Sequence, residues 1–242
     1  MGKLLFLFII GTIGMTLRFF IIGEFELDQI FILFLFPIGA FVLWFVHKWM
    51  VSRDVNYIPS STDETWNTNM GERYSNGVKQ LYKGKEKVAV YRRFYQHRWQ
   101  LWVNEVVEGD GNWYMNLSFE FAAEGKVEIV EGRSSIFKNN TNWIIVRDGE
   151  PVGKVKTEFS IKNAAKLKEA LTIEIDDKVI YYQSFGIGSP TDVLIDDHVV
   201  AKGKRSEVLR SKYHFELVDD EYEKLEEVLV MGFILFNYVH KQ

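Results

Sequence analysis

The chain has 242 residues, no cysteine and a formal net charge of −4 at neutral pH. The lack of cysteine excludes disulfides, thiolate metal sites and cysteine nucleophiles. The acidic balance excludes a basic field over the whole protein of the kind that binds nucleic acid, so any recognition of anions must be local. Apolar residues make up 47% of the sequence, and they are unevenly placed, with a marked excess in the first fifty positions.

Two apolar stretches open the chain and predict a transmembrane hairpin in residues 1–50. Residues 4–22 carry one charged side chain, Arg18, and residues 30–46 carry none before His47, Lys48 and Trp49. Each stretch is long enough to cross the hydrocarbon of a bilayer, so we expect helices at about 4–22 and 30–49. A signal peptide is the alternative for the first stretch, although no small-x-small cleavage site follows it.

The basic residues around this hairpin predict its orientation. Lys3, Lys48 and Arg53 flank its open end, whereas the connecting turn is acidic. The positive-inside rule then places the N-terminus and the rest of the chain in the cytoplasm, as parts of an integral, multi-pass protein of the cell membrane. Arg18 lies toward the other end of the first helix and counts against this orientation.

Residues 51–84 are polar and contain Pro59 followed by a run of serine, threonine and acidic residues. Such a composition predicts a linker or a loosely ordered entry segment.

Residues 85–242 carry short alternating runs typical of an all-β domain. The aspartate-rich pairs 148–149, 176–177 and 196–197 and the segment 108–112 predict hairpin turns. One helix is expected at 161–170. The predicted strands are 87–95, 98–107, 113–121, 126–131, 134–138, 143–147, 152–159, 171–175, 179–185, 193–195, 199–204 and 213–218.

The last segment, 221–240, predicts a helix that is buried on every side. It begins with acidic residues and has no polar side chain from Val228 to Phe236. The apolar part of this segment is too short to span a bilayer. The acidic residues at its start suit the N-terminus of a helix better than a membrane interface. The alternative is a third membrane segment. A closed barrel of about twelve strands is too wide for its own side chains to fill. We therefore predict a mainly β fold, a roughly twelve-stranded closed barrel around this buried C-terminal helix.

Two hairpins resemble each other, and they also resemble the recurring hairpin of a known family. Residues 148–156 read DGEPVGKVK and residues 196–204 read DDHVVAKGK, and the chain closes with a strand, an acidic helix start and the apolar helix. From about residue 84 to the end, this pattern resembles the tubby C-terminal-like superfamily, which includes the LURP-one-related proteins and the phospholipid scramblases. The resemblance implies a twelve-stranded barrel around a hydrophobic C-terminal helix. The resemblance does not cover the membrane hairpin or the linker. The composition, rich in Lys, Ile, Phe and Asn, is typical of a bacterium with a low-GC genome.

The resemblance also implies where a ligand would bind, because tubby domains hold phosphoinositide headgroups through basic surface residues. In this sequence Lys154 and Lys156 share one predicted strand face, and Lys202 and Lys204 share another with Arg205 close by, so these basic residues are the candidates for such a site. Ammonium groups that converge on one patch attract a phosphate or an anionic bilayer. The alternative is that these are solvated strand faces that discourage pairing between sheet edges.

Motifs for other chemistry are missing from the sequence. There is no G-x-S-x-G elbow, P-loop or dinucleotide fingerprint, the five histidines lack metal-ligand spacing, and 108–112 lacks the pattern of a calcium-binding EF-hand. We therefore predict a non-enzymatic protein without cofactor or metal, which binds anionic lipid headgroups or a protein partner at the cytoplasmic membrane face. The alternatives are a structural partner in a membrane complex and scramblase-like lipid handling.

Overall fold

The computed structural model divides into two compact units, which we describe separately. The hairpin unit is Met1–Ser52 with Tyr95–Tyr114, and the barrel unit is Arg53–Phe94 with Met115–Gln242. The structure describes residues 1–23, 27–59, 64–73, 76–106, 114–123, 125–132, 141–157, 169–186, 188–207 and 210–240.

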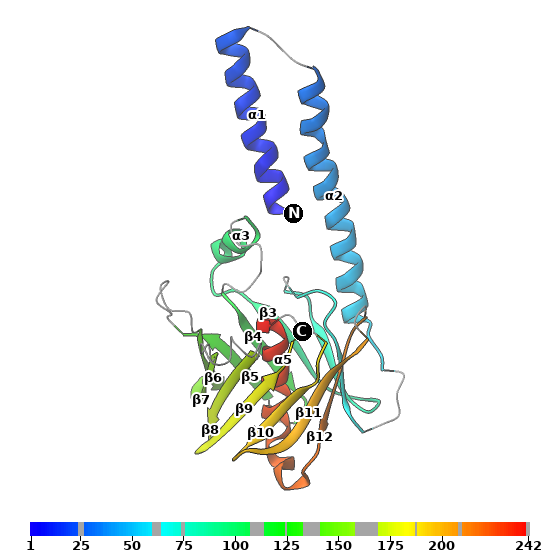
Figure 1. Cartoon of the computed structure of the whole chain (residues 1–242), viewed down its shortest axis with the longest axis vertical. Helices are drawn as coiled ribbons and strands as arrows, with labels where there is room; N and C mark the ends of the chain where they lie inside the picture. The colour runs from blue at the N-terminus through cyan, green and yellow to red at the C-terminus, as the bar shows by residue number, and fades with distance from the viewer. Residues whose placement is uncertain are drawn as a thin grey trace. The chain divides into compact units, whose positions relative to one another are not determined.

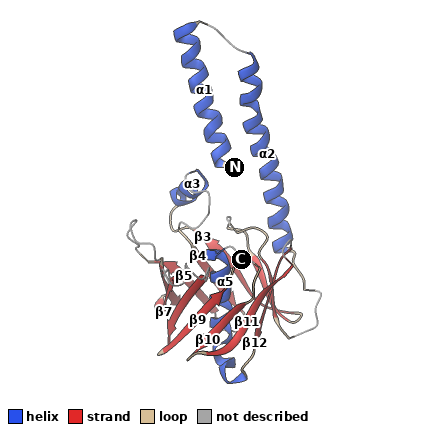
Figure 2. Cartoon of the chain, in the orientation of Figure 1, coloured by secondary structure: helices blue, strands red, loops and turns tan. Residues whose placement is uncertain are grey.

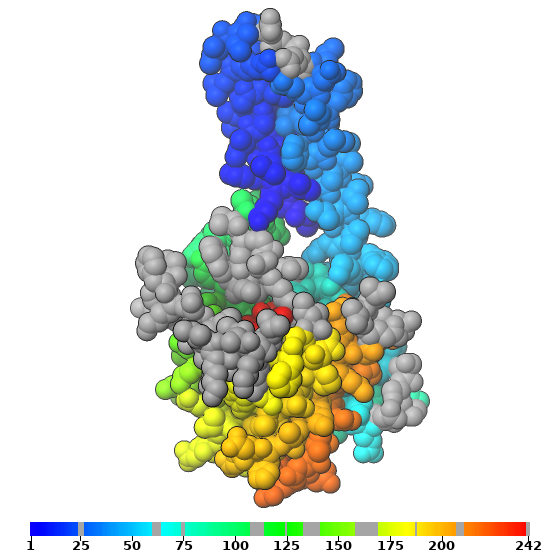
Figure 3. Space-filling view, in the orientation of Figure 1, coloured from blue at the N-terminus to red at the C-terminus, as the bar shows by residue number. Residues whose placement is uncertain are grey.

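Two long apolar helices, α1 (Gly2–Ile22) and α2 (Leu27–Val55), dominate the hairpin unit. They run side by side (Figures 1 and 3), with the rings of Phe8 and Phe34 6.4 Å apart. Their outward side chains are exposed, and both helices are long and apolar enough to cross a membrane. The predicted pair of helices is present, and α2 continues past residue 49 to Val55.

Twelve antiparallel strands close into a barrel in the order β1-β12-β11-β10-β9-β8-β7-β6-β5-β4-β3-β2. Figure 2 shows these strands around the C-terminal helix. The strands are β1 (Trp66–Asn69), β2 (Lys79–Lys83), β3 (Glu86–Phe94), β4 (Asn116–Phe121), β5 (Gly125–Glu131), β6 (Asn142–Arg147), β7 (Glu150–Thr157), β8 (Glu169–Ile175), β9 (Lys178–Ser184), β10 (Thr191–Ile195), β11 (His198–Glu207) and β12 (Arg210–Leu217).

The C-terminal helix α5 (Glu226–His240) lies inside this barrel, after the short 3-10 helix η1 (Asp220–Leu225). Every side chain from Val228 to Tyr238 is buried. The backbone of β11 comes close to α5 at Gly203, where a Cβ atom would overlap the Phe233 ring. The hydroxyl of Tyr182 donates a hydrogen bond to the Leu229 carbonyl at 3.0 Å. The predicted fold, a closed barrel around a buried C-terminal helix, is confirmed.

The acidic turns adopt the geometry that two-residue hairpins need. Asp176 and Asp177 have φ values of 47° and 58°, and Asp196 and Asp197 have 50° and 64°. Positive φ at both central positions is the signature of a type I′ turn, whose twist matches that of the flanking strands. The two turns join β8 to β9 and β10 to β11, as the sequence predicts.

The interpretation of residues 51–84 as a linker is wrong for much of that segment, because it supplies β1 and β2. Strand β1 pairs with both β12 and β2 and so completes the closure of the barrel. Its sequence, WNTN, is fully buried although it is mostly polar. The polar side chains have partners: Thr68 Oγ1 donates to the Gln80 carbonyl at 2.9 Å. Because all four residues of β1 are buried and three of them are polar, its sequence lacks the alternation of apolar and polar residues that predicts a strand.

The strand predicted at 98–107 is also wrong, because Arg98–Val106 is the helix α3 of the hairpin unit. The apolar residues of this segment fit a period of 2 and a period of 3.6 almost equally well. The turn at 108–112 and the strand at 134–138 lie outside the described residues, as does all of the predicted helix at 161–170 except its last two positions, which belong to β8.

Candidate functional site

The predicted lysines form two separate pairs on the outer face of the barrel. Lys154 and Lys156 are exposed on β7, and Lys202 and Lys204 are exposed on β11. Three strands, β8 to β10, lie between the pairs. With about 4.8 Å between neighbouring strands, the pairs are roughly 19 Å apart along the sheet. The structure therefore does not bring the four ammonium groups together.

The β7 pair lies among carboxylates. Lys156 Nζ is 2.7 Å from Glu174 Oε1 on β8, and Lys154 lies directly opposite Glu174 in the strand register. The hydrogen bond and the charge of Lys156 lower the pKa of Glu174. Lys154 also lines a surface hollow of about 580 Å³ with Glu174, Asp176 and other residues. The carboxylates around Lys154 and Lys156 make this location more suitable for a cation than for an anion.

The β11 pair borders a smaller hollow of about 180 Å³, which we call the β11–β12 hollow. Lys204 lies opposite His214, and Lys202 lies opposite Glu216. Its lining residues are Thr65, Pro190, Lys202, Gly203, Lys204, His214, Phe215 and Glu216. Two lysines and a histidine thus meet one carboxylate in this hollow, so it is the more basic of the two predicted locations.

Arg205 faces away from the two lysines that precede it. Side chains alternate along a strand, and a register shift follows Arg205. Its guanidinium lies 5.9 Å from the centre of the Tyr213 ring, and Arg73 lies 5.5 Å from the same ring. The structure therefore separates Arg205 from Lys202 and Lys204 and groups it with a second set of polar residues.

Next to Arg205 lies a largely buried group of polar residues, the Asp54 cluster, which the sequence reasoning missed: Asp54, Asn69, Glu72, Arg73, Lys79, Tyr213 and Tyr238. Asp54 lies in the last turn of α2, within the barrel unit. Its carboxylate accepts hydrogen bonds from Asn69 Nδ2 at 2.6 Å, from the Gly71 amide at 3.0 Å and from the Glu72 amide at 2.9 Å. These bonds join the end of α2 to the segment after β1.

Lys79, fully buried on β2, supplies a positive charge to the cluster. Its Nζ is 3.9 Å from Asp54 Oδ2 and 5.9 Å from the centre of the Tyr238 ring. Burial alone would lower the pKa of Lys79, but Tyr238, Glu72 and Asp54 outweigh it, so this pKa lies above its ordinary value. Burial raises the pKa of Tyr238. The cluster therefore contains a charged lysine beside a neutral phenol.

Arg73 connects the same cluster to the end of α5. Its Nη1 donates to the Asn237 carbonyl at 2.9 Å, and its Nη2 donates to the Tyr213 hydroxyl. A guanidinium at the carboxyl end of a helix complements the helix dipole. Together, Asp54 and Arg73 fasten both the last turn of α2 and the last turns of α5 to the barrel wall, which is a structural role.

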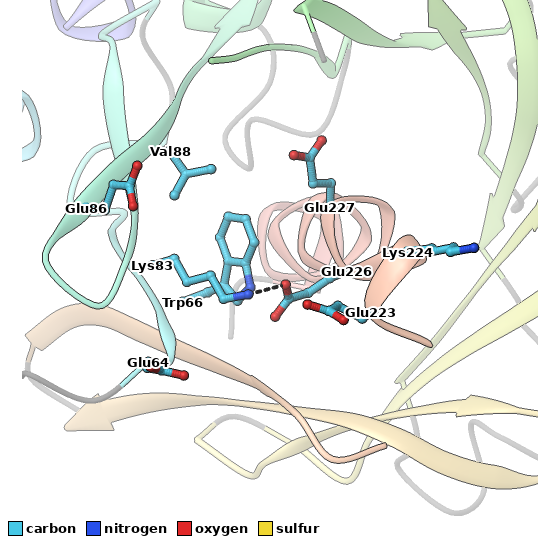
Figure 4. Close-up of a pocket in the computed structure, with 9 residues that line it drawn as sticks. All are labelled: Glu64, Trp66, Lys83, Glu86, Val88, Glu223, Lys224, Glu226 and Glu227. Atoms are coloured by element: carbon cyan, nitrogen blue, oxygen red, sulfur yellow. Dashed lines mark hydrogen bonds and ion pairs between the residues drawn. The ribbon is translucent and has the colours of Figure 1, made fainter. Parts of the chain in front are cut away.

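A further acidic hollow lies where α5 begins (Figure 4). It has a volume of about 580 Å³ and is lined by Glu64, Trp66, Lys83, Glu86, Val88, Glu223, Lys224, Glu226 and Glu227. Lys83 Nζ is 2.6 Å from Glu226 Oε2, an ion pair that joins β2 to the first turn of α5. The described residues contain no group of three or more histidine and acidic side chains placed to hold a metal ion. We interpret this hollow as the anchoring point of the helix start.

His240, in the last turn of α5, gives the barrel a pH dependence. Burial lowers its pKa to about 4, and Glu169 Oε2, 4.0 Å from Nδ1, does not offset this effect. Because the unfolded chain binds the proton more tightly, stability is full above about pH 6.5 and falls as the pH drops toward 4. We expect a loss of about 2–3 kcal/mol from this residue over that range.

The measurement is urea unfolding of the full-length protein in detergent at several pH values. His240→Phe should be less sensitive to acid than the wild type, and His198→Phe, at the exposed first position of β11, should behave as the wild type does. An identical pH profile for wild type and His240→Phe would contradict the expectation.

The comparisons with known proteins leave these sites to be interpreted from their geometry, since no protein-family model, curated protein or solved structure matches the chain.

Proposed function

We propose that this chain is a membrane-anchored, non-enzymatic protein whose barrel binds an anionic lipid headgroup at its surface. The observation that carries the proposal is the filled interior of the barrel. Val228 to Tyr238 of α5 are buried against the strands, so α5 occupies the space in which a wide barrel would otherwise enclose a ligand. A ligand then has to bind on the outside.

The β11–β12 hollow is the best place for an anion among the described residues. Lys202, Lys204 and His214 border it, and its volume of about 180 Å³ is below the roughly 300 Å³ at which ligand pockets usually begin. A single phosphate-sized headgroup fits such a space better than a larger ligand. Lysines near an anionic bilayer contribute about 1 kcal/mol each.

The hairpin increases the effect of a weak site. A domain tethered to the bilayer meets its headgroups at a high effective concentration, so a modest affinity is enough for occupancy. The exposed apolar surfaces of α1 and α2 support the tether. The basic residues Lys3, Lys48 and Arg53 favour a cytoplasmic location for the barrel.

We further propose that the barrel is tubby-like. The closed twelve-stranded barrel and its buried C-terminal helix agree with the architecture that the resemblance implies, and the recurring acidic turns support it. Scramblase-like transport is less favoured, because it would require the packed interior to open. A protein partner at the same surface is the alternative occupant, and the experiment below distinguishes it.

The experiment measures binding of short-chain phosphatidic acid to the full-length protein in detergent by calorimetric titration. We expect Lys202→Glu with Lys204→Glu to weaken binding by at least roughly 30-fold, since two lysines contribute about 2 kcal/mol. Short-chain phosphatidylcholine should not bind the wild type measurably.

The matched control reverses Lys85 and Lys87, two exposed lysines near the β2–β3 turn, and makes the same change in net charge. This control should bind as the wild type does. Equal weakening in both variants would reduce the effect to net charge. Undiminished binding in the β11 variant would overturn the β11–β12 hollow as the lipid site, and no measurable binding by the wild type would favour a protein partner at this surface.

A further inference from the structure

Helix α3 has its polar side inward and its aromatic side outward. Gln100 and Asn104 are 7% and 4% exposed, whereas Trp99 and Trp102 are 53% and 68% exposed. A helix on the surface of a water-soluble protein is expected to show the opposite arrangement, with polar side chains outward and apolar ones inward. The nine residues are too few to span a bilayer.

Hydrogen bonds and ring contacts hold this inverted arrangement in place. Gln100 Oε1 accepts from the His97 amide at 3.1 Å, and Asn104 Nδ2 donates to the Tyr95 hydroxyl at 3.0 Å. The Trp99 ring makes an edge contact with Tyr114 at 5.4 Å. Gln100 and Asn104 thus each have a hydrogen-bond partner inside the hairpin unit, which keeps these side chains inward and the indoles outward.

Helix α3 is attached to the open end of the hairpin. Its last turn packs on the start of α1, where a Cβ on Gly2 would lie 3.2 Å from side-chain atoms of both Glu105 and Val106. On the neighbouring helix, a Cβ on Gly39 would lie 3.3 Å from Leu4. The start of α1 is therefore roughly level with the turn of α2 that precedes Trp44.

The end of α2 at this level has the composition of a membrane interface. Trp44 and Trp49 are exposed, and Lys48 Nζ lies 4.4 Å from the centre of the Trp44 ring. Tryptophan and lysine concentrate where hydrocarbon meets headgroups. Helix α3 thus lies at the same level of the hairpin as these interface residues, and it presents two more indoles there.

We propose that α3 is an interfacial helix whose Trp99 and Trp102 insert into the headgroup boundary of the membrane that the hairpin crosses. The proposal depends on the membrane anchor and not on the lysines of the β11–β12 hollow. A lipid surface is the occupant because α3 belongs to the same compact unit as the two exposed apolar helices. Arg98 and Glu105, its charged side chains, cancel, so the insertion is apolar and should need no anionic lipid.

The insertion involves the connection between two paired strands. Phe94 at the end of β3 pairs directly with Asn116 at the start of β4. A few residues would be enough to connect strands in this register. The chain instead makes an excursion through α3, which belongs to the hairpin unit.

The natural lack of cysteine allows a direct test in the full-length protein. Single cysteines at Trp99, Trp102, Ile13 and Lys85 are labelled with a nitroxide in nanodiscs of neutral phosphatidylcholine. Paramagnetic resonance then compares collision of each label with oxygen, which enters lipid, and with a water-soluble nickel chelate. Ile13, exposed on α1, reports membrane insertion, and Lys85 reports water.

We expect the labels at 99 and 102 to collide preferentially with oxygen, as the label at 13 does. A label at 102 that behaves like that at 85, while the label at 13 is in lipid, overturns the interfacial helix and leaves the anchor intact. The labels at 99 and 102 could instead collide rarely with both reagents and show spin coupling between copies of the protein. This result would also overturn the interfacial helix, because a second protein chain would then cover its aromatic face.

Discussion

Replacing Asp54 by alanine is expected to lower the unfolding free energy of the barrel by about 3–5 kcal/mol, the usual cost of leaving one partner of a buried charge pair alone. The substitution removes the acceptor of three hydrogen bonds and leaves the fully buried Lys79 without the nearby carboxylate of Asp54. The measurement is urea unfolding of the full-length protein in detergent, followed by near-ultraviolet circular dichroism.

A double-mutant cycle separates the charge pair from the other contacts of Asp54. Lys79→Met combined with Asp54→Ala should cost less than the sum of the two single changes, because the second substitution removes the charge that the first leaves unpaired. Asp28→Ala, at the exposed start of the same helix, should change stability by less than about 0.5 kcal/mol. Additive effects in the cycle would show that Lys79 and Asp54 are not coupled.

The sequence predicts most of the architecture because its strongest signals are local. Acidic pairs such as Asp176 with Asp177 fix tight turns, and the apolar run of α5 has no solvent-facing side. The expected number of strands agrees with the barrel partly by coincidence. The segment expected as a strand at 98–107 is a helix, while β1 and β2 come from the expected linker.

The Asp54 cluster could not be predicted from the sequence, because its members meet only after the barrel has closed. Asp54 and Lys79 are 25 positions apart, and Tyr238 comes from the other end of the chain. The lysine pairs illustrate the same limit. Their hairpins look alike in sequence, but only the order of the strands shows that β7 and β11 are separated by three others.

Helix α3 was predicted as a strand for a different reason. Its alternation of aromatic and polar residues imitates a half-buried strand, and the polar residues Gln100 and Asn104 face inward. A rule that places apolar residues inside a soluble domain misjudges such a segment. The rule applies to surfaces that face water, and α3 belongs to a unit whose two other helices are exposed, apolar and long enough to cross a membrane.

Replacing Gly232 by valine is expected to destabilise the barrel by about 3 kcal/mol or more. A Cβ at this position of α5 would overlap the Tyr182 hydroxyl and crowd Ile173. Tyr182 is fully buried and donates its hydrogen bond to Leu229 of the same helix, so it can move aside only by losing that bond. Overpacking costs about 1–3 kcal/mol, and an unmade buried hydrogen bond adds a similar amount.

Gly14→Val is the matched control, because Gly14 also lies within a helix and a Cβ there meets nothing within 4 Å. Both variants are unfolded with urea as full-length proteins in detergent, and the midpoint of the barrel transition is compared with that of the wild type. The control should retain the wild-type midpoint, whereas Gly232→Val should unfold at a markedly lower urea concentration. Equal midpoints for the two variants would mean that the contact between α5 and β9 is loose, and the barrel interior would then have room that our proposal of an outside ligand denies.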